Sequence, residues 1–299
     1  RHQVPAIATF AMFEAIGTLI GVDDPFDTSA RCGRTQLIPV DPGSSEETFT
    51  GVAWVMARMT LLWCISLYIS ALCAKLIILP RLPRSSVEKE NTPFHVGQKI
   101  PAFLRAVIVS GLANICLCAF WSKSIEQNFL AGPAIEIAGM FFTSFEIADL
   151  LVGVLHGMMG LEYLVHHLLH IGLGLIIRGN CVAGLLAAVL MAQETSGIFL
   201  NYFLLIRNRY PDHWSVKWSF VLFAAAFFVY RIGLGTFGTY FYVRYYNEYL
   251  PPTVPSWQGH LIAVVIVLAS LLQWYWGWVI AGKVITALSA GGKSPVKTE

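Results

Sequence analysis

The chain has 299 residues, of which 56% are hydrophobic and only 13% are charged. A typical soluble domain carries about 25% charged residues, so this composition excludes an ordinary soluble protein and indicates a chain embedded in a bilayer. The formal net charge is +2, which excludes the strongly basic balance typical of nucleic-acid binding. We therefore expect no nucleic-acid partner.

The N-terminal segment, residues 1–51, is mixed in character. Val4–Val22 is apolar but contains one glutamate, and it fits an extra membrane span, a signal remnant or a helix lying in the interface. Asp23–Thr50 is polar and rich in Asp, Pro, Ser and Gly, which predicts an exposed loop. Cys32 lies in this loop, and a disulfide to Cys181 is geometrically open.

Seven apolar runs follow, separated by short polar connectors. A helix needs about 20 apolar residues to cross the hydrocarbon core, and the fourth run is the shortest. The runs are Val52–Leu79, Ala102–Trp121, Ala134–Gly157, Leu161–Ile177, Val182–Ile206, Val216–Tyr242 and Leu261–Ala281. The pattern predicts an all-α polytopic bundle of about seven transmembrane helices, in which residues 52–283 form the membrane domain and residues 284–299 a tail.

Basic residues in the connectors predict the orientation of this bundle. Those that share a face with the C-terminus are Arg81, Arg84, Lys89, Lys99, Arg207, Arg209, Lys217, Lys283, Lys293 and Lys297, whereas the opposite loops carry Lys123, Arg178 and Arg244. Cytoplasmic loops of membrane proteins carry the excess of Lys and Arg. The C-terminus and the tail are therefore predicted to be cytosolic, and the residues before Val52 luminal.

Three histidines fall inside the fourth apolar run, at His166, His167 and His170. Ionisable side chains within a membrane are costly and usually mark a functional site. His166 and His170 share one helix face because they are four residues apart. The alternative is that these imidazoles are satisfied structurally in the core.

Polar residues on the other runs also fall on helical stripes. The third run carries Glu146, Asp149, Gly153 and His156, the fifth carries Glu194, Gly197 and Asn201, and the sixth carries Arg231. Such stripes predict one shared polar interior. The predicted cavity residues are Asp149, His166, His167, His170, Glu194, Ser196, Asn201, Arg231, Gln273 and Trp276. Two structural alternatives remain: Arg231 forms an ion pair with Glu194 or Asp149, and the tryptophans of the last run form an interfacial belt.

Four segments resemble, in order, the TLC domain, the membrane domain shared by ceramide synthases, the translocon-associated TRAM proteins and a set of lipid-handling proteins. The segments are Phe145–Leu151 with Asp149, Tyr163–His170 with the paired histidines, Ala192–Asn201 with Glu194 and Ser196, and Phe227–Ile232 with Arg231. The resemblance covers Phe141–Lys283, with Arg105 in the helix that opens the domain. It implies a TLC-type bundle of six helices around a central cavity, in the endoplasmic reticulum membrane.

The acidic segment indicates a branch of this family. Ceramide synthases have a second acid where this chain has Gly197, and Glu194-Thr195-Ser196 looks more like the TLC domain-containing protein subtype 4 branch. That branch is linked to membrane lipid homeostasis. The resemblance therefore favours a protein that binds or handles membrane lipids, with those lipids as its partners.

The alternative function is an acyl-CoA-dependent acyltransferase of the ceramide synthase type. In that hypothesis His166 or His167 is the nucleophile or general base, Asp149 or Glu194 orients it, and Arg231 offsets developing charge. Acyl-CoA would be a co-substrate, and no other cofactor is expected. A structural bundle or translocon accessory without a small-molecule site is a further possibility.

The pattern His-His-x-x-His also resembles one box of membrane di-iron hydroxylases. Such sites need several boxes and more histidines than this chain gathers in one place, because His2, His95, His213 and His260 are scattered in loops or at helix edges. No metal site is therefore predicted.

Overall fold

The computed structural model describes residues 45–252 and 254–289. Within these ranges all regular structure is helical, apart from one isolated bridge between Leu130 and Val182. The predicted all-α polytopic fold is thereby confirmed. The predictions for Val4–Val22 and Cys32 lie outside the described residues. The end of the predicted loop Asp23–Thr50 differs, because a helix already begins at Ser45.

The helices follow one another with short connections. In chain order they are α2 (Ser45–Cys73), η1 (Ala74–Ile78), η2 (Leu79–Arg81), η3 (Glu88–Asn91), α3 (Pro93–Gly97), α4 (Lys99–Phe120), α5 (Ile125–Asn128), α6 (Pro133–Leu155), α7 (Leu161–Asn180), α8 (Gly184–Ala192), α9 (Glu194–Ile206), α10 (Trp214–Ala226), η4 (Phe227–Leu234), α11 (Gly235–Tyr249) and α12 (Ser256–Ser289). Segments η1 and η4 are π-helical, and η2 and η3 are 3-10 helices.

Six helical segments within the described residues are long and apolar enough to cross a membrane. They are Ala53–Arg81, Pro93–Phe120, Pro133–Leu155, Gly184–Ile206, Trp214–Tyr249 and Ser256–Thr286. Each of the seven predicted runs is helical, but α7 does not reach this apolar composition because it carries Glu162, Arg178 and three histidines. The helix that holds the histidines is thus the polar member of the bundle.

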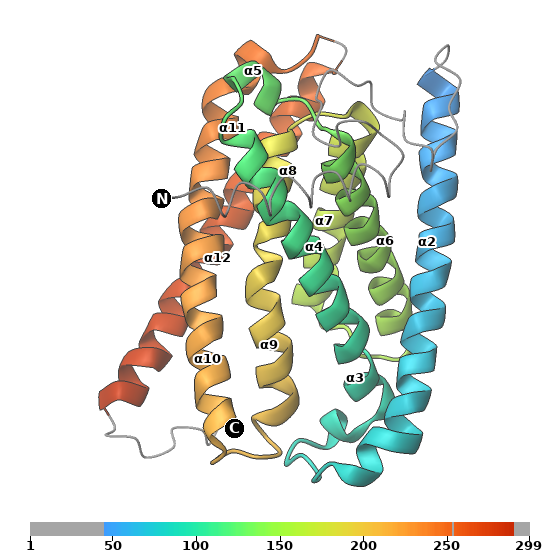
Figure 1. Cartoon of the computed structure of the whole chain (residues 1–299), viewed down its shortest axis with the longest axis vertical. Helices are drawn as coiled ribbons and strands as arrows, with labels where there is room; N and C mark the ends of the chain where they lie inside the picture. Colours follow the sequence, from blue (N-terminus) through green and yellow to red (C-terminus); the bar gives the residue numbers. More distant parts are fainter. Residues whose placement is uncertain (1–44, 253, 290–299) are drawn as a thin grey trace, which may run out of the picture.

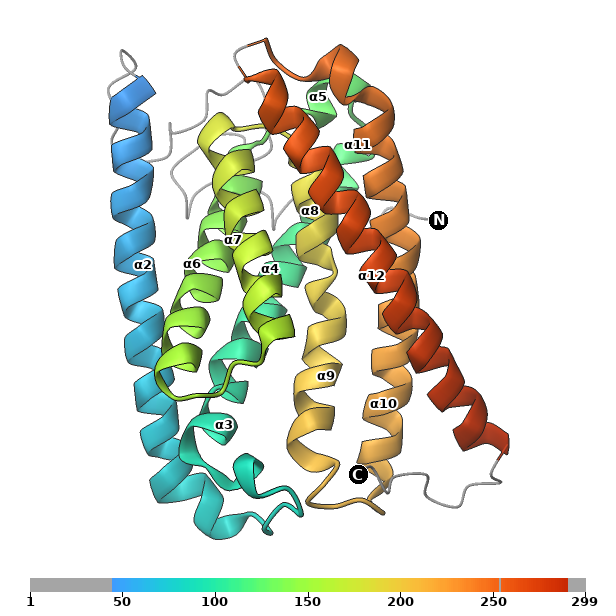
Figure 2. The ribbon, with the colours of Figure 1, turned by 180° about the vertical axis from the view of Figure 1, so that it is seen from behind.

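The helices run alternately up and down, which gives the bundle two distinct ends (Figure 1). Residues 82–92, residues 207–213 and the last turns of α12 lie at one end, which we call the basic end after its arginines and lysines. The start of α2, helix α5 and the α7–α8 turn lie at the opposite end. The α6–α7 turn stops short of the basic end (Figure 2). The first turns of α7 therefore lie within the depth of the bundle.

Buried Arg209 joins two loops at the basic end. Its guanidinium donates to the carbonyl oxygens of Pro83 and Glu90, both at 2.6 Å. The Asn208 amide donates to the Glu90 carboxylate at 2.9 Å, and Ser85 donates to the same carboxylate at 2.6 Å. Buried polar groups are costly unless they are hydrogen-bonded, so these contacts fix the α9–α10 connection against residues 82–92.

The α7–α8 turn at the opposite end is tight. Cys181 and Ala183 adopt left-handed backbone conformations with φ of 54° and 57°, which non-glycine residues seldom do. Backbone hydrogen bonds hold the turn, from Ala131 to Cys181 at 3.1 Å and from Ala183 to Phe129 at 2.7 Å. Cys181 is disulfide-bonded, whereas its predicted partner lies outside the described residues.

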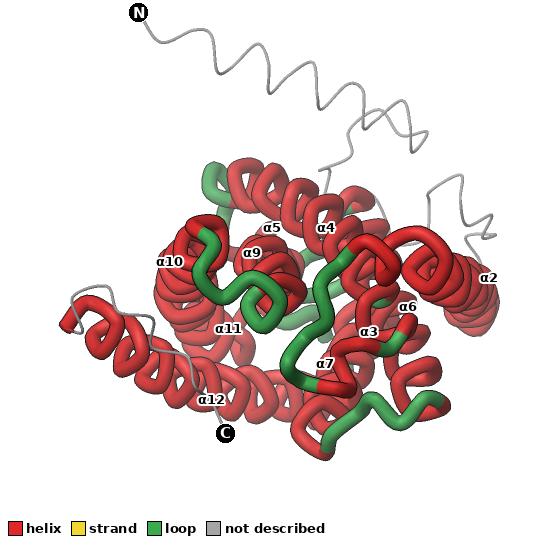
Figure 3. Tube along the Cα trace, turned by 90° about the horizontal axis from the view of Figure 1, so that it is seen from below, coloured by secondary structure: helices red, strands yellow, loops and turns green. Residues whose placement is uncertain are grey.

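Small side chains let the inner helices approach closely. Helices α4, α6 and α8 meet through Ala113, Ala138, Ala188 and Ala192, which are all fully buried. Small residues are typical of helix interfaces in membranes because they permit close backbone contact. Helix α6 is the most buried span, and α2 and α12 are the least buried and lie at the periphery (Figure 3). The interior around α6 is where the polar residues gather.

Candidate functional site

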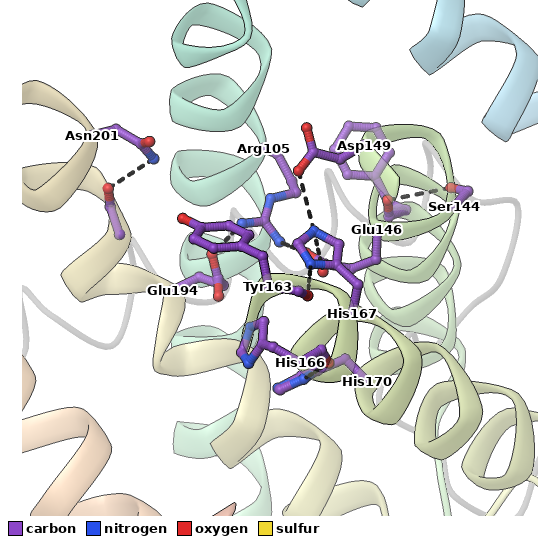
Figure 4. A network of polar contacts seen from close by, with 12 residues as sticks. Arg105, Ser144, Glu146, Asp149, Tyr163, His166, His167, His170, Glu194 and Asn201 are labelled. Carbon is purple, nitrogen blue, oxygen red and sulfur yellow. Dashed lines mark hydrogen bonds and ion pairs between the residues drawn. The ribbon is translucent and has the colours of Figure 1, made fainter. Parts of the chain in front are cut away.

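Arg105 lies at the centre of a group of charged side chains inside the bundle (Figure 4). It projects from α4 and pairs with Glu146 of α6 at 2.7 Å and with Glu194 of α9 at 2.5 Å. Its guanidinium also lies over the rings of Phe142 and Phe145, at 5.0 and 4.7 Å. The Arg105 side chain is only 9% exposed, so its charge depends on these partners rather than on solvent.

His167 of α7 joins this group from the opposite side. Its Nδ1 lies 2.8 Å from the carbonyl oxygen of Tyr163. Its Nε2 lies 3.1 Å from Asp149 and 3.3 Å from Glu146, both on α6. A carbonyl oxygen and an ionised carboxylate only accept hydrogen bonds. Both ring nitrogens therefore face acceptors, which leaves no lone pair of His167 available for catalysis unless a carboxyl group carries the proton.

Arg231 completes the group from η4. Its Nε donates to the Ser196 hydroxyl at 2.8 Å, and its guanidinium lies 3.8 Å from Glu194. The ion pair with Glu194 is one of the alternatives that the sequence left open. Arg231 lies in a π-helical segment, and single π-helical turns inside α-helices are frequent at functional sites. We call Arg105, Glu146, Asp149, His167, Glu194 and Arg231 the ion cluster.

The charges of the ion cluster nearly balance. Two guanidinium groups face three carboxylates, and one proton on the His167 imidazole or on a carboxyl group makes the cluster neutral. Every member comes from a helix within the bundle, and an unbalanced charge at that depth is expensive. The members of the ion cluster can thus balance one another's charges, and their contacts join α4, α6, α7, α9 and η4.

His166 and His170 lie on the neighbouring face of α7. Their rings are 4.0 Å apart between centroids. The Nδ1 of His170 lies 2.8 Å from the backbone oxygen of His166. If this nitrogen carries the proton and donates it to that oxygen, the Nε2 of the neutral ring is left as an acceptor. Among the described residues, none hydrogen-bonds to the His166 ring. Of the three histidines, His166 is therefore the least constrained by its protein neighbours.

A cavity of about 60 Å³ lies between α6, α7 and α8, next to His170. Its walls are mostly apolar, and Phe142, Leu173 and Leu190 contribute to them. Gly139 and Gly174 also line the cavity. An added Cβ at Gly139 would meet only the end of Arg178 at 3.9 Å, so this glycine leaves space, whereas at Gly174 it would lie 2.5 Å from the Thr143 hydroxyl. Four polar residues also line it, namely Glu136, Thr143, His170 and Arg178, so only the apolar part of the wall suits an apolar group. The cavity thus offers an apolar site beside the histidine pair.

The other predicted cavity residues lie apart from the ion cluster. Asn201 donates to the backbone oxygen of Gly197 in its own helix at 2.9 Å. Gln273 is buried on α12, and Trp276 packs near Phe223 and Phe227. No hydrogen bond or ion pair among the described residues joins these three side chains to the ion cluster. His156, from the predicted stripe on α6, is exposed and stacks on Phe94 instead.

The sequence placed Glu146 on a polar stripe and Arg105 in the helix that opens the domain, but neither residue was among the predicted site residues. Arg105 is the single charged residue within the predicted second span, and Glu146 precedes Asp149 by three residues on the same helix face. Those two signals were present in the sequence. Their meaning depends on which helices are neighbours, because Arg105 is 41 residues from Glu146 and 89 residues from Glu194.

A comparison with known families matches residues 51–281 to the model described as the TLC domain. This match covers more than half of the chain and includes every member of the ion cluster. No curated protein matches the chain.

Proposed function

The chain belongs to the TLC domain family, and on that premise we propose that it binds a membrane lipid inside its helical bundle. The ion cluster takes the polar headgroup, and the cavity between α6, α7 and α8 takes part of an alkyl chain. The lipid serves as a bound ligand in membrane lipid homeostasis.

The observation that carries this proposal is the juxtaposition of charge and apolar space. Arg105, Arg231, Asp149, Glu194 and His167 offer cationic and anionic groups within one small region. A zwitterionic or hydroxylated headgroup presents the complementary charges and donors. The side chain of Asp149 is 18% exposed, more than any other member of the ion cluster. It is therefore the member with most room for a ligand.

The apolar cavity supplies the second half of the site. His170 lines it, and its ring lies 4.0 Å from that of His166 between centroids, so the cavity begins beside the histidine pair. An alkyl segment placed there leaves water, and each buried methylene group contributes about 0.8 kcal/mol. Polar and apolar recognition at one place is typical of lipid-binding sites.

Lipid that co-purifies with the full chain tests this proposal. A Gly139→Leu variant should fill the cavity without a backbone clash, because the nearest atom to an added Cβ is the end of Arg178 at 3.9 Å. The matched control is Gly111→Leu, which faces open space. We expect mass spectrometry to find a bound lipid in the wild type and control and its loss in Gly139→Leu. Equal lipid in all three proteins would contradict the proposal.

An Asp149→Asn variant tests the headgroup contact separately. It removes the carboxylate charge beside His167, whereas Glu90→Gln removes another buried carboxylate at the basic end. Loss of one hydrogen bond, worth about 1 kcal/mol, should lower lipid affinity roughly fivefold in Asp149→Asn only. A change in the selected headgroup class would support the assignment further, and equal losses in both variants would refute it.

We also propose, from the resemblance of Glu194-Thr195-Ser196, that the chain is nearer the TLC domain-containing protein subtype 4 branch than the ceramide synthases. A Cβ at position 197 would lie 3.3 Å from the Glu194 carboxylate and 3.8 Å from Ala106. A second acid at this position would press against an existing carboxylate. This arrangement supports lipid binding over acyl transfer.

Acyl transfer is the second candidate because the His166 ring is free of hydrogen bonds to the described residues. In that reaction an amine attacks the thioester carbonyl of acyl-CoA, the imidazole accepts the amine proton, and the coenzyme A thiolate leaves and takes up that proton. His166 fits this role better than His167, whose two ring nitrogens already face acceptors.

Purified protein incubated with a sphingoid base and radiolabelled acyl-CoA distinguishes the two functions. Lipid binding without chemistry predicts no N-acylated product. Robust product that falls by orders of magnitude in His166→Ala, but far less in the neighbouring His170→Ala, would establish the enzyme instead.

Two features support a cytosolic basic end. The basic end carries the exposed Arg81, Arg84 and Lys217, as expected for cytoplasmic loops. Cys181, at the opposite end, is disulfide-bonded, and disulfides persist in oxidising compartments. We therefore propose that α12 ends in the cytosol and that the α7–α8 turn faces the lumen of the endoplasmic reticulum.

A further inference from the structure

A groove lies on the outer surface of the bundle between α11 and α12. Helix α12 crosses the bundle obliquely (Figure 2). The groove is lined by Thr236, Thr239, Tyr240, Val243 and Arg244 of α11 and by Val267 of α12. It has a volume of about 480 Å³ and is open to the surroundings on its outer side. It shares no residue with the ion cluster or the apolar cavity.

Two hydrogen bonds connect α11 and α12 beside the groove. Thr239 and Ser270 share a hydrogen bond of 2.7 Å between their hydroxyl groups, and the Trp274 indole donates to the Thr236 hydroxyl at 3.1 Å. These contacts connect α11 to α12 and satisfy the hydroxyl groups at membrane depth. The groove is therefore a fixed feature of the helix pair, as a binding site requires.

Tyr240 and Arg244 are the polar groups that the groove leaves open. They are four residues apart and so lie on one helix face. Both are exposed, Tyr240 at 64%. Arg244 contacts the ring of Tyr245 at 5.1 Å, but no carboxylate among the described residues forms an ion pair with it. This face thus offers a hydroxyl group and a cation without a direct ion pair among the described residues, although the exposed Glu248 lies one turn further along the same face.

Arg244 lies near one end of its span, and a helix end at the outer edge of the polar layer of the bilayer would place it at the inner boundary of that layer. It lies five residues before the end of α11 at Tyr249, which corresponds to about 8 Å along the helix. The polar layer of a bilayer is about 5–8 Å thick on each side. An arginine exposed at this boundary is costly unless it reaches a polar partner, and a lipid phosphate can accept two parallel hydrogen bonds from a guanidinium group.

We propose that the groove between α11 and α12 binds one glycerophospholipid of the surrounding leaflet. Arg244 holds the phosphate, and the Tyr240 hydroxyl donates to an ester carbonyl of the lipid. One acyl chain lies along Val243 and Val267 toward Thr236. This site is separate from the proposed lipid site inside the bundle, and it recognises the phosphate rather than a particular headgroup.

Native mass spectrometry of the full chain in mild detergent tests this site, with phosphatidylcholine as the titrated probe. Arg244→Met should bind about tenfold more weakly, which corresponds to the loss of one charge-assisted hydrogen bond. The matched control is Arg58→Met, because Arg58 is also exposed and also lies over an aromatic ring, that of Trp54 at 4.7 Å. The control should bind phosphatidylcholine like the wild type.

Two further measurements make the result decisive. Diacylglycerol with the same acyl chains lacks the phosphate and should bind the wild type about as weakly as phosphatidylcholine binds Arg244→Met. Val243→Trp fills the groove without touching the charge and should also weaken phosphatidylcholine binding. The proposal is overturned if Arg244→Met binds like the wild type, if Arg58→Met weakens binding equally, or if diacylglycerol binds as tightly as phosphatidylcholine.

Discussion

Replacing Arg105 with leucine should strongly destabilise the bundle. The variant keeps an apolar side chain in α4 but leaves the carboxylates of Glu146 and Glu194 without their shortest partner, with side chains only 6% and 13% exposed. Breaking a buried ion pair costs about 3–5 kcal/mol. Arg231, 3.8 Å from Glu194, and His167, 3.3 Å from Glu146, partly compensate. We therefore expect a loss near the lower end, about 3 kcal/mol.

Thermal unfolding in detergent, followed by tryptophan fluorescence at a fixed scan rate, measures this loss. A change of 1 kcal/mol shifts Tm by about 2–4 °C in a protein of this size, so Arg105→Leu should lower Tm by about 6–12 °C. The control Arg58→Leu removes an exposed arginine and should change Tm by no more than about 2 °C. Adding Glu194→Gln to Arg105→Leu should cost less than the sum of the single changes. The reasoning would be refuted if the Tm of Arg105→Leu lay within 2 °C of the wild type, a shift that corresponds to roughly 0.5 to 1 kcal/mol. It would also be refuted if the losses of the two single variants added up to the loss of the double variant.

Three other predictions concern packing, the basic end and orientation. Gly97→Ala should destabilise the fold by about 1–3 kcal/mol, because its Cβ would lie 2.6 Å from the backbone of Ala71. In the control Gly111→Ala the new Cβ meets no atom within 4 Å, so this change should be neutral or stabilising by up to about 1 kcal/mol. Similar melting curves for the two variants would contradict the packing. Arg209→Ala removes two hydrogen bonds to loop carbonyls, so limited proteolysis should cut residues 82–92 faster than in the wild type, and an unchanged rate would contradict that role. In sealed microsomes, protease should remove a C-terminal tag, and Cys181 should react with a maleimide only after reduction and permeabilisation; a protected tag would reverse the orientation.

The sequence alone determined that the chain is a helical membrane protein and where most of its helices lie. Apolar runs of about 20 residues have few other solutions, because backbone groups in lipid must be hydrogen-bonded within the helix. Helical spacing also placed Asp149, His167 and Glu194 among the interior candidates. The TLC resemblance of the four polar segments rests on the same residues, and the family match agrees with it.

Only the tertiary structure decided which of those residues meet. Periodicity fixes the face of a single helix, but it fixes neither the rotation nor the depth of one helix against another. Packing brings Arg105 between Glu146 and Glu194, and it engages both nitrogens of His167 while leaving His166 free of hydrogen bonds to the described residues. It forms no hydrogen bond or ion pair between Gln273 or Trp276 and the ion cluster within the described residues. Adjacent histidines of one helix thus occupy different environments, because neighbouring positions on a helix point about 100° apart and only one of them faces the carboxylates of α6.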